Sequence, residues 1–166
     1  MKLKFMSLLL AVVLILGGCS TLNNSSATDK DALAAAIDAY IQNEIYTGED
    51  LPLMMEYQNA ILSEIRYELL SFDIEKGTMD VKFTYIDVLH LADSIANPNI
   101  EEDDYYTACL EKISSRDYKT ITKELGLNFE LVEGRYALIQ SDALANVISG
   151  GVLDYYLELM EEVHNE

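Results

Sequence analysis

The amino-acid sequence predicts an α+β fold in which two β-hairpins form a curved antiparallel sheet packed against amphipathic helices. Apolar residues recur at helical spacing in some segments and alternate with polar residues in two others. Each alternating segment is divided by a turn that contains glycine, Glu75-Lys76-Gly77-Thr78 in one and Glu133-Gly134 in the other. Segments of both periods in this order indicate an α+β domain. Residues 30–166, about 135 residues, are ample for a single core.

The domain is expected to begin with an amphipathic helix. Thr28-Asp29-Lys30-Asp31 places an acidic residue three positions after a threonine, which is typical of a helix start. The residues that then follow one helical face are Leu33, Ala36, Ile37, Tyr40 and Ile41. We predict that this helix ends near Tyr46, before Gly48 and Pro52 break the pattern. A shorter helix is expected next, with apolar residues at Met54, Tyr57 and Ile61.

The first β-hairpin is predicted from about Ile65 to Tyr85. In its first strand apolar residues alternate with polar residues, but the alternation shifts by one residue partway along. This shift indicates a bulge. The residues of the two phases are Tyr67 and Leu69, then Phe72 and Ile74. The second strand alternates polar residues with Met79, Val81, Phe83 and Tyr85. This alternation is typical of a strand with one buried and one solvated face.

Two helices are predicted between the hairpins. The first carries Val88, Leu91, Ala92 and Ile95 on one side and stops at Asn97-Pro98-Asn99. The second runs from Glu101 to Ile113 and begins with four consecutive acidic residues, Glu101 to Asp104. We interpret this run as a solvated first turn, because negative charge favours the positive end of the helix dipole. A calcium site is the alternative, but the run lacks the alternate-position ligands and central glycine of an EF-hand loop.

The second hairpin is predicted over residues 118–139. Its long strand carries on one face Leu125, Leu127, Phe129 and Leu131. Glu133-Gly134 turns the chain into a strand from Arg135 to Ile139. Ser141-Asp142 then marks the start of a helix through Ile148. After Gly150-Gly151, a last amphipathic face is formed by Val152, Leu153, Tyr156, Leu157 and Met160.

The N-terminal segment has the parts of an export signal. Lys2 and Lys4 precede an apolar run from Phe5 to Leu16, which is shorter than the roughly 20 residues of a membrane-spanning helix. The run ends in Leu16-Gly17-Gly18-Cys19, and residues 16–19 show no A-x-A-like site of an ordinary secretory signal. An uncleaved signal anchor is the other alternative, but the run is short and a polar tract follows it.

Leu16-Gly17-Gly18-Cys19 resembles the lipobox of bacterial lipoproteins. The resemblance implies that Cys19 is lipidated on sulfur and becomes the N-terminus after cleavage. We therefore expect residues 1–18 to be a cleaved lipoprotein signal peptide, and residues 19–29 to comprise the lipidated Cys19 and a flexible tether. Two or three acyl chains would hold the protein on a membrane, since each buried methylene contributes about 0.8 kcal/mol.

The charge and the cysteines exclude some classes of function. The net charge of −18 becomes −20 when Lys2 and Lys4 leave with the signal peptide, so we expect no nucleic-acid partner. Such a charge also keeps a tethered protein soluble. With Cys19 lipidated, Cys109 has no disulfide partner and is predicted to be a small buried hydrophobe. A catalytic pair of Cys109 with His90 is the alternative, and no spacing indicates it.

Over roughly Lys30 to Met160 the pattern resembles a known group. The features that carry the resemblance are the order of helices and strands, the strand Val81-Lys82-Phe83-Thr84-Tyr85-Ile86-Asp87, the hairpin Glu133-Gly134-Arg135-Tyr136-Ala137-Leu138-Ile139, and Gly150-Gly151. They are similar to those of small Gram-positive lipoproteins with a cystatin-like or nuclear-transport-factor-two-like domain. This resemblance implies an antiparallel sheet that curls around a helix. A tryptophan often follows the turn glycine in that group, whereas this chain has Tyr136 nearby and no tryptophan.

The same resemblance implies a candidate pocket on the concave face of the sheet. Some members of the wider superfamily are isomerases or dehydratases that use Asp and Tyr there. An aspartate base would need a raised pKa, and a tyrosine would have to donate to the developing oxyanion. The tyrosines on predicted strands are Tyr67, Tyr85, Tyr118 and Tyr136. No spacing singles out an Asp/Tyr pair, and tyrosine is also favoured on strands for its packing alone.

The sequence favours a function in binding. HExxH, P-loop, GxSxG and CxxC motifs are all absent. We assign no catalytic, cofactor-binding or metal-binding residue, and Cys19 is the one predicted site residue. The expected role is that of a binding or accessory module tethered to the cell membrane and facing the extracytoplasmic side. Its expected partners are the membrane, through the lipid, and another envelope protein or a small ligand. A small-molecule isomerase or dehydratase is the alternative.

Overall fold

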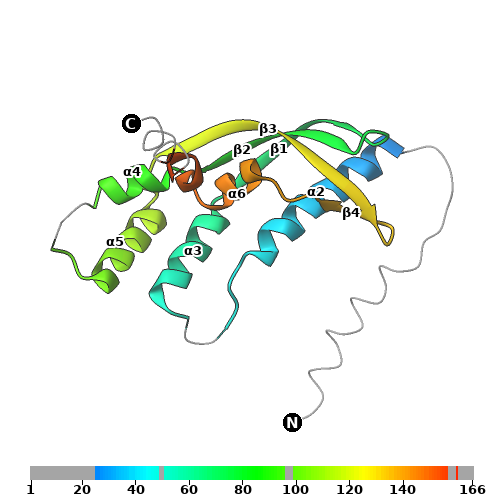
Figure 1. Ribbon diagram of the computed structural model, residues 1–166. Coiled ribbons are helices and arrows are strands. Elements are labelled where there is room, and N and C mark those ends of the chain that lie inside the picture. Colours follow the sequence, from blue (N-terminus) through cyan, green and yellow to red (C-terminus); the bar gives the residue numbers. More distant parts are fainter. Residues whose placement is uncertain (1–24, 49–50, 96–98, 157–159, 161–166) are drawn as a thin grey trace, which may run out of the picture.

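The fold is α+β, as the sequence predicts. A computed structural model describes residues 25–48, 51–95, 99–156 and 160. It contains a four-stranded antiparallel sheet in the order β1-β2-β3-β4, with the helices gathered mainly along one side of the sheet (Figure 1). Cys19 and the predicted signal peptide, residues 1–18, lie outside the described residues. No helix within the described ranges combines the length and the apolar character needed to cross a membrane.

The helices and strands occur in the predicted order. The helices are α2 (Ser25–Asn43), α3 (Leu53–Ser63), α4 (Val88–Asp93), α5 (Glu102–Ser115) and α6 (Asp142–Ile148). The strands are β1 (Arg66–Asp73), β2 (Thr78–Ile86), β3 (Thr120–Val132) and β4 (Arg135–Leu138). Residues 152–156 and 160 are also helical, whereas Leu157 lies outside the described residues.

Both ends of α2 differ from the prediction. The helix begins at Ser25, so Thr28 does not cap it, and residues 25–29 of the expected tether are helical. Serine and alanine can continue a helix, and no glycine or proline stops it there. The helix ends at Asn43 rather than near Tyr46. Its last turn tightens, because the amides of Glu44 and Ile45 donate to carbonyls three residues earlier at 3.1 and 3.2 Å.

The first hairpin has the predicted bulge. Leu69 pairs with Val81 and Ser71 pairs with Asp80, so one residue of β1 is left unpaired between them. On β2 the four residues predicted to share one face are all buried, namely Met79, Val81, Phe83 and Tyr85. The phase shift in the sequence therefore marked a real change of register.

The second hairpin also forms, with one correction to its buried face. Glu133 and Gly134 have φ of 51° and 80°, as a two-residue hairpin turn requires. Leu125, Leu127 and Phe129 are buried. The remaining member of the predicted face, Leu131, is 65% exposed, because it lies near the hairpin tip, which projects from the domain (Figure 1).

Buried side chains form two clusters. The first fills the space between the sheet and helices α2 and α6, with Leu33 and Ile37 of α2 against Val81 and Phe83 of β2. The second joins α3, α4 and α5 beyond the end of β2, and its members are Tyr57, Ile61, Ile86, Leu91, Cys109 and Ile113. Helix α3 contributes to both clusters, since Leu62 belongs to the first. The seam between the clusters therefore runs along α3.

The ends of α4 and α5 agree with the sequence pattern. The Asp87 side chain caps α4 by accepting a hydrogen bond from the His90 amide at 3.0 Å. The acidic run places Glu102, Asp103 and Asp104 in the first turn of α5. All three are exposed, which confirms the solvated first turn.

Gly150 and Gly151 bring the C-terminal segment against the start of α4. Their φ values are +65° and +89°, a region that side chains disfavour. The Val88 amide donates to the Gly150 carbonyl at 3.1 Å. A Cβ atom on Gly150 would lie 2.2 Å from Cγ2 of Val88, so only glycine permits this approach.

We predict that Gly150→Ala lowers the free energy of unfolding by about 3 kcal/mol, because it adds a steric clash to the strain of a positive φ. Gly134→Ala is the matched control, since Gly134 also has a positive φ but no atom lies within 4 Å of its added Cβ. This control should lower the free energy of unfolding by about 1 kcal/mol. Urea denaturation of both variants measures the difference. Equal losses would show that Val88 yields to the added methyl group.

Candidate functional site

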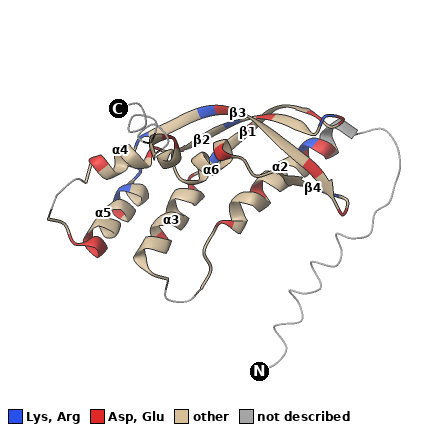
Figure 2. Ribbon diagram, viewed as in Figure 1, with Lys and Arg blue, Asp and Glu red and all other residues tan. Residues whose placement is uncertain are grey.

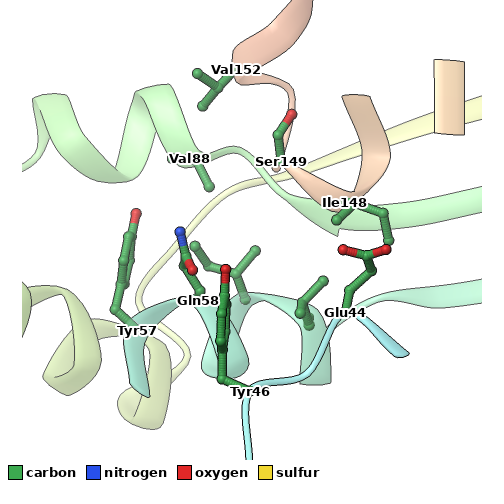
Figure 3. Close-up of a pocket in the computed structure, with 10 residues that line it drawn as sticks. Glu44, Tyr46, Tyr57, Gln58, Val88, Ile148, Ser149 and Val152 are labelled. Carbon is green, nitrogen blue, oxygen red and sulfur yellow. The ribbon is translucent and has the colours of Figure 1, made fainter. Parts of the chain in front are cut away.

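A cavity of about 370 Å³ lies among the helices, and we take it as the candidate site. Its wall comes from the segment after α2, from α3, from the start of α4 and from the end of α6 (Figure 3). Its apolar residues are Ile61, Leu62, Val88, Ile148 and Val152. Its polar or amphipathic residues are Glu44, Tyr46, Tyr57, Gln58 and Ser149.

The cavity lies at the seam between the two buried clusters. Leu62 belongs to the cluster under the sheet, and Ile148 packs against that cluster. Ile61 belongs to the second cluster, and Val88 packs against it. Neither cluster closes over the groove between them, so the apolar wall of the cavity is continuous with both cores.

Tyr57 lines this wall, but its hydroxyl is buried within the second cluster. The residue is 8% exposed, and its oxygen is buried without a hydrogen-bond partner among the described residues. Leaving such a group unpaired costs about 1–3 kcal/mol. Burial, and next the neighbouring Cys109 thiol, raise the pKa of the Tyr57 phenol. Tyr57 therefore stays protonated at neutral pH, and its buried oxygen lies beside Cys109 in the second cluster.

Asn59 holds the backbone of Tyr46 at the rim of the cavity. The Tyr46 amide donates to Oδ1 of Asn59 at 2.8 Å, and Nδ2 of Asn59 donates to the Tyr46 carbonyl at 2.8 Å. Both bonds are made by backbone atoms of Tyr46, so its side chain remains free of them and is 45% exposed. Figure 3 shows the hydroxyls of Tyr46 and Tyr57 pointing to the same side, toward Val88 and Val152.

A buried amide positions the opposite wall. Asn146 is 1% exposed, and its Nδ2 donates to Oδ2 of Asp154 at 2.8 Å. Its Oδ1 accepts from the Asp154 amide at 2.8 Å. Nζ of Lys123, on β3, lies 2.9 Å from the same Oδ2. These contacts fix the segment that carries Val152 relative to α6 and the sheet.

The structure pairs two tyrosines with aspartates, and both pairs join α2 to the sheet. The Tyr67 hydroxyl donates to Oδ1 of Asp38 at 2.8 Å, and the Tyr136 hydroxyl donates to Oδ1 of Asp29 at 3.2 Å. Both pairs tie α2 to the sheet, at β1 and β4. Tyr85 is 1% exposed in the core beneath α2 and α6.

The cavity differs from the pocket that the resemblance implied. Its lining residues belong to helices and the segments beside them, and none belongs to a strand. They include one carboxylate, that of Glu44, and no aspartate or histidine. Tyr118, the other tyrosine predicted on a strand, precedes β3, and its hydroxyl donates to Oε2 of Glu64 at 2.8 Å.

Cys109 is buried with 0% exposure, which confirms its prediction as a small buried hydrophobe. Burial raises the pKa of its thiol, while Tyr105 and Tyr57 beside it lower that pKa to a smaller extent. A raised pKa disfavours the thiolate needed for nucleophilic attack. His90 instead lines a second cavity of about 220 Å³, together with Lys112, Arg116 and Lys119.

Cys19, the one site residue predicted from the sequence, lies outside the described residues. Across the described ranges, no group of three or more His, Cys, Asp or Glu side chains is arranged to hold a metal ion. From the sequence, Tyr57 is predicted only as an apolar position of a helix, and neither Tyr46 nor Asn59 is predicted as a site residue. An Asn side chain that pairs with a backbone 13 residues away leaves no local signal in the sequence.

No protein-family model matches the chain, and no curated protein and no solved structure is significantly similar to it. An apolar wall with a few polar groups suits the binding of an amphipathic small molecule.

We predict that the free energy of unfolding falls as the pH rises above about 10. Tyr57 and Tyr67 have pKa values raised from 10.0, chiefly by burial, so above pH 10 the unfolded chain loses their protons before the folded chain does. Their contribution to the free energy of unfolding is fully present below pH 10. It is lost as the pH rises toward their pKa values in the folded state. Tyr57→Phe and Tyr67→Phe should each reduce this pH dependence, measured by denaturation between pH 8 and 11. Tyr156→Phe, at a residue that is 59% exposed, should leave it unchanged.

Proposed function

We propose that this protein is a lipid-anchored binding module at the cell membrane, on the extracytoplasmic side. The cavity of about 370 Å³ is the observation that carries the binding part of the proposal. The anchor is supported by the sequence alone, through the short apolar run and Leu16-Gly17-Gly18-Cys19. We propose a small ligand as the partner, because a cavity of this size with a largely apolar wall suits a small molecule.

The position of the cavity is compatible with an anchor at Cys19. Five residues separate Cys19 from the start of α2 at Ser25, a length of chain that reaches at most about 20 Å. The 19 residues of α2 extend about 28 Å, and the cavity is lined by Glu44 and Tyr46, which follow the C-terminal end of this helix. The anchored end of the domain and the ligand site are therefore at opposite ends of α2. When the protein is anchored in this way, the membrane would leave the mouth of the cavity accessible to water-soluble ligands.

We also propose that the domain is a cystatin-like variant. The long helix α2 lies against the antiparallel sheet, and its buried residues Leu33 and Ile37 contact the first cluster. This arrangement supports the comparison with small lipoproteins that the residue pattern suggested. The helices α4 and α5, inserted between β2 and β3, then form the second cluster and one side of the seam.

We predict that cells expressing the full chain incorporate an alkyne-labelled fatty acid into it, and that Cys19→Ala abolishes this label. Cys109→Ala is the matched control, because it removes the other cysteine of the chain and should leave the label unchanged. Gel fluorescence after coupling to an azide dye measures incorporation. Label that survives Cys19→Ala would contradict the anchor.

A further inference from the structure

We propose that the tip of the second hairpin inserts Leu131 and Val132 into the surface of the membrane that holds the lipid anchor. The inference rests on the proposed anchor at Cys19 and adds a second contact, which would fix how the domain stands on the bilayer. Three features support it: the end of the domain at which the tip lies, the exposure of its apolar side chains and the shortness of the chain between Cys19 and the domain.

The tip lies at the end of the domain where α2 begins. Leu131 pairs with Tyr136 across the hairpin, and the Tyr136 hydroxyl donates to Oδ1 of Asp29 at 3.2 Å. Asp29 is about 6 Å along α2 from its first residue, Ser25. Figure 1 shows the hairpin tip and the start of α2 on the same side of the domain.

The chain that precedes α2 is too short to hold this end far from a membrane. Five residues separate Ser25 from Cys19, and they reach at most about 20 Å. If Cys19 carries the acyl chains, the bilayer surface lies within that distance of Ser25. The parts of the domain nearest to this surface are then the start of α2 and the hairpin turns beside it.

Both hairpin turns are at this end of the sheet. Because the strands are antiparallel in the order β1-β2-β3-β4, the β1–β2 turn and the β3–β4 turn leave the sheet at the same end. The Phe129 amide donates to the Gly77 carbonyl at 2.9 Å, which holds the first turn against β3. Ile74, in that first turn, is also exposed. It adds a third apolar side chain at the anchored end.

The tip is apolar on both of its faces. Leu131 is 65% exposed and Val132 is 46% exposed. Successive residues of a strand point to opposite faces, so these two side chains point away from each other. A protein partner that docked on one face of the hairpin would cover only one of them. A bilayer surrounds an inserted tip and removes both side chains from water.

Charge does not attract this end to a membrane. The charged residues nearest the tip are Glu130, Glu133 and Arg135, with a net charge of −1. The net charge of the chain is −18, and Figure 2 shows Asp and Glu spread over both helices and strands. An anionic lipid surface would repel such a domain. The contact therefore depends on apolar burial, and a zwitterionic bilayer is sufficient for it.

Tryptophan fluorescence tests the contact, because the chain contains no tryptophan and one substitution gives a unique signal. The full chain, purified from membranes with its fatty acid, is reconstituted in phosphatidylcholine vesicles with or without bromine on the acyl chains. Bromine quenches an indole only at close range. Leu131→Trp and Val132→Trp should each lose about a third of their fluorescence in the brominated vesicles.

Met54→Trp is the matched control. Met54 is exposed at the start of α3, which follows the C-terminal end of α2, and its indole should lose less than about a tenth of its fluorescence. This control also tests whether an exposed indole on the anchored domain enters the bilayer by itself.

A second substitution tests the role of apolar burial. In the Leu131→Trp chain, Val132→Ser should reduce the quenching about twofold, because less apolar surface is removed from water at the tip. Met54→Ser in the same chain should leave the quenching unchanged. Adding phosphatidylglycerol to the vesicles should not increase the quenching at either tip position.

Each result decides for or against the hairpin contact. Quenching at both tip positions, together with little at Met54, supports it. Quenching at neither tip position or at only one of them, equal quenching at Met54, or quenching that requires phosphatidylglycerol would overturn it. A chain that carries the fatty acid but has an unquenched tip contradicts the hairpin contact alone. Absence of fatty acid from Cys19 contradicts the anchor instead.

Discussion

The burial of one face of α2 against the sheet is the constraint on which the rest of the structure depends. Leu33 and Ile37 are fully buried in the same cluster as Val81 and Phe83. The Tyr67–Asp38 and Tyr136–Asp29 hydrogen bonds fix the helix at the two outer strands. Apolar burial contributes most of the free energy, and the two hydrogen bonds set the direction of the helix. That direction determines where the chain leaves α2 and hence where α3 begins.

The cavity follows from the presence of two cores in one small domain. Helices α4 and α5 separate the two hairpins in sequence and build the second cluster around Leu91, Cys109 and Ile113. Helix α3 has to serve both clusters, with Leu62 in one and Tyr57 in the other. Gly150 brings the C-terminal segment against Val88 and closes the seam from the other side. A groove lined by apolar residues remains between the closely packed regions.

The polar groups at this seam differ in their hydrogen-bond partners. Asn146 is buried and uses both ends of its amide on Asp154, so it stabilises the wall without facing a ligand. Asn59 likewise uses both ends of its amide, on the backbone amide and carbonyl of Tyr46. Tyr57 alone among the buried side chains of the described residues keeps an unpaired polar atom. Asn146 and Asn59 therefore stabilise the two sides of the seam, whereas the Tyr57 hydroxyl is buried beside Cys109 in the second cluster.

The class of fold, the order of helices and strands, the bulge in β1 and the turn at Glu133-Gly134 can all be predicted from the sequence. Those features depend on hydrophobic period and on turn residues, which are local properties of the chain. The tertiary structure decided that α2 starts at Ser25, that Leu131 is exposed, and that the cavity lies among helices rather than on the sheet face. These features depend on contacts between residues far apart in sequence, such as the pairing of Asn59 with the Tyr46 backbone. Periodicity shows which face of an element is apolar, but it does not show which other element covers that face or where the cover is incomplete.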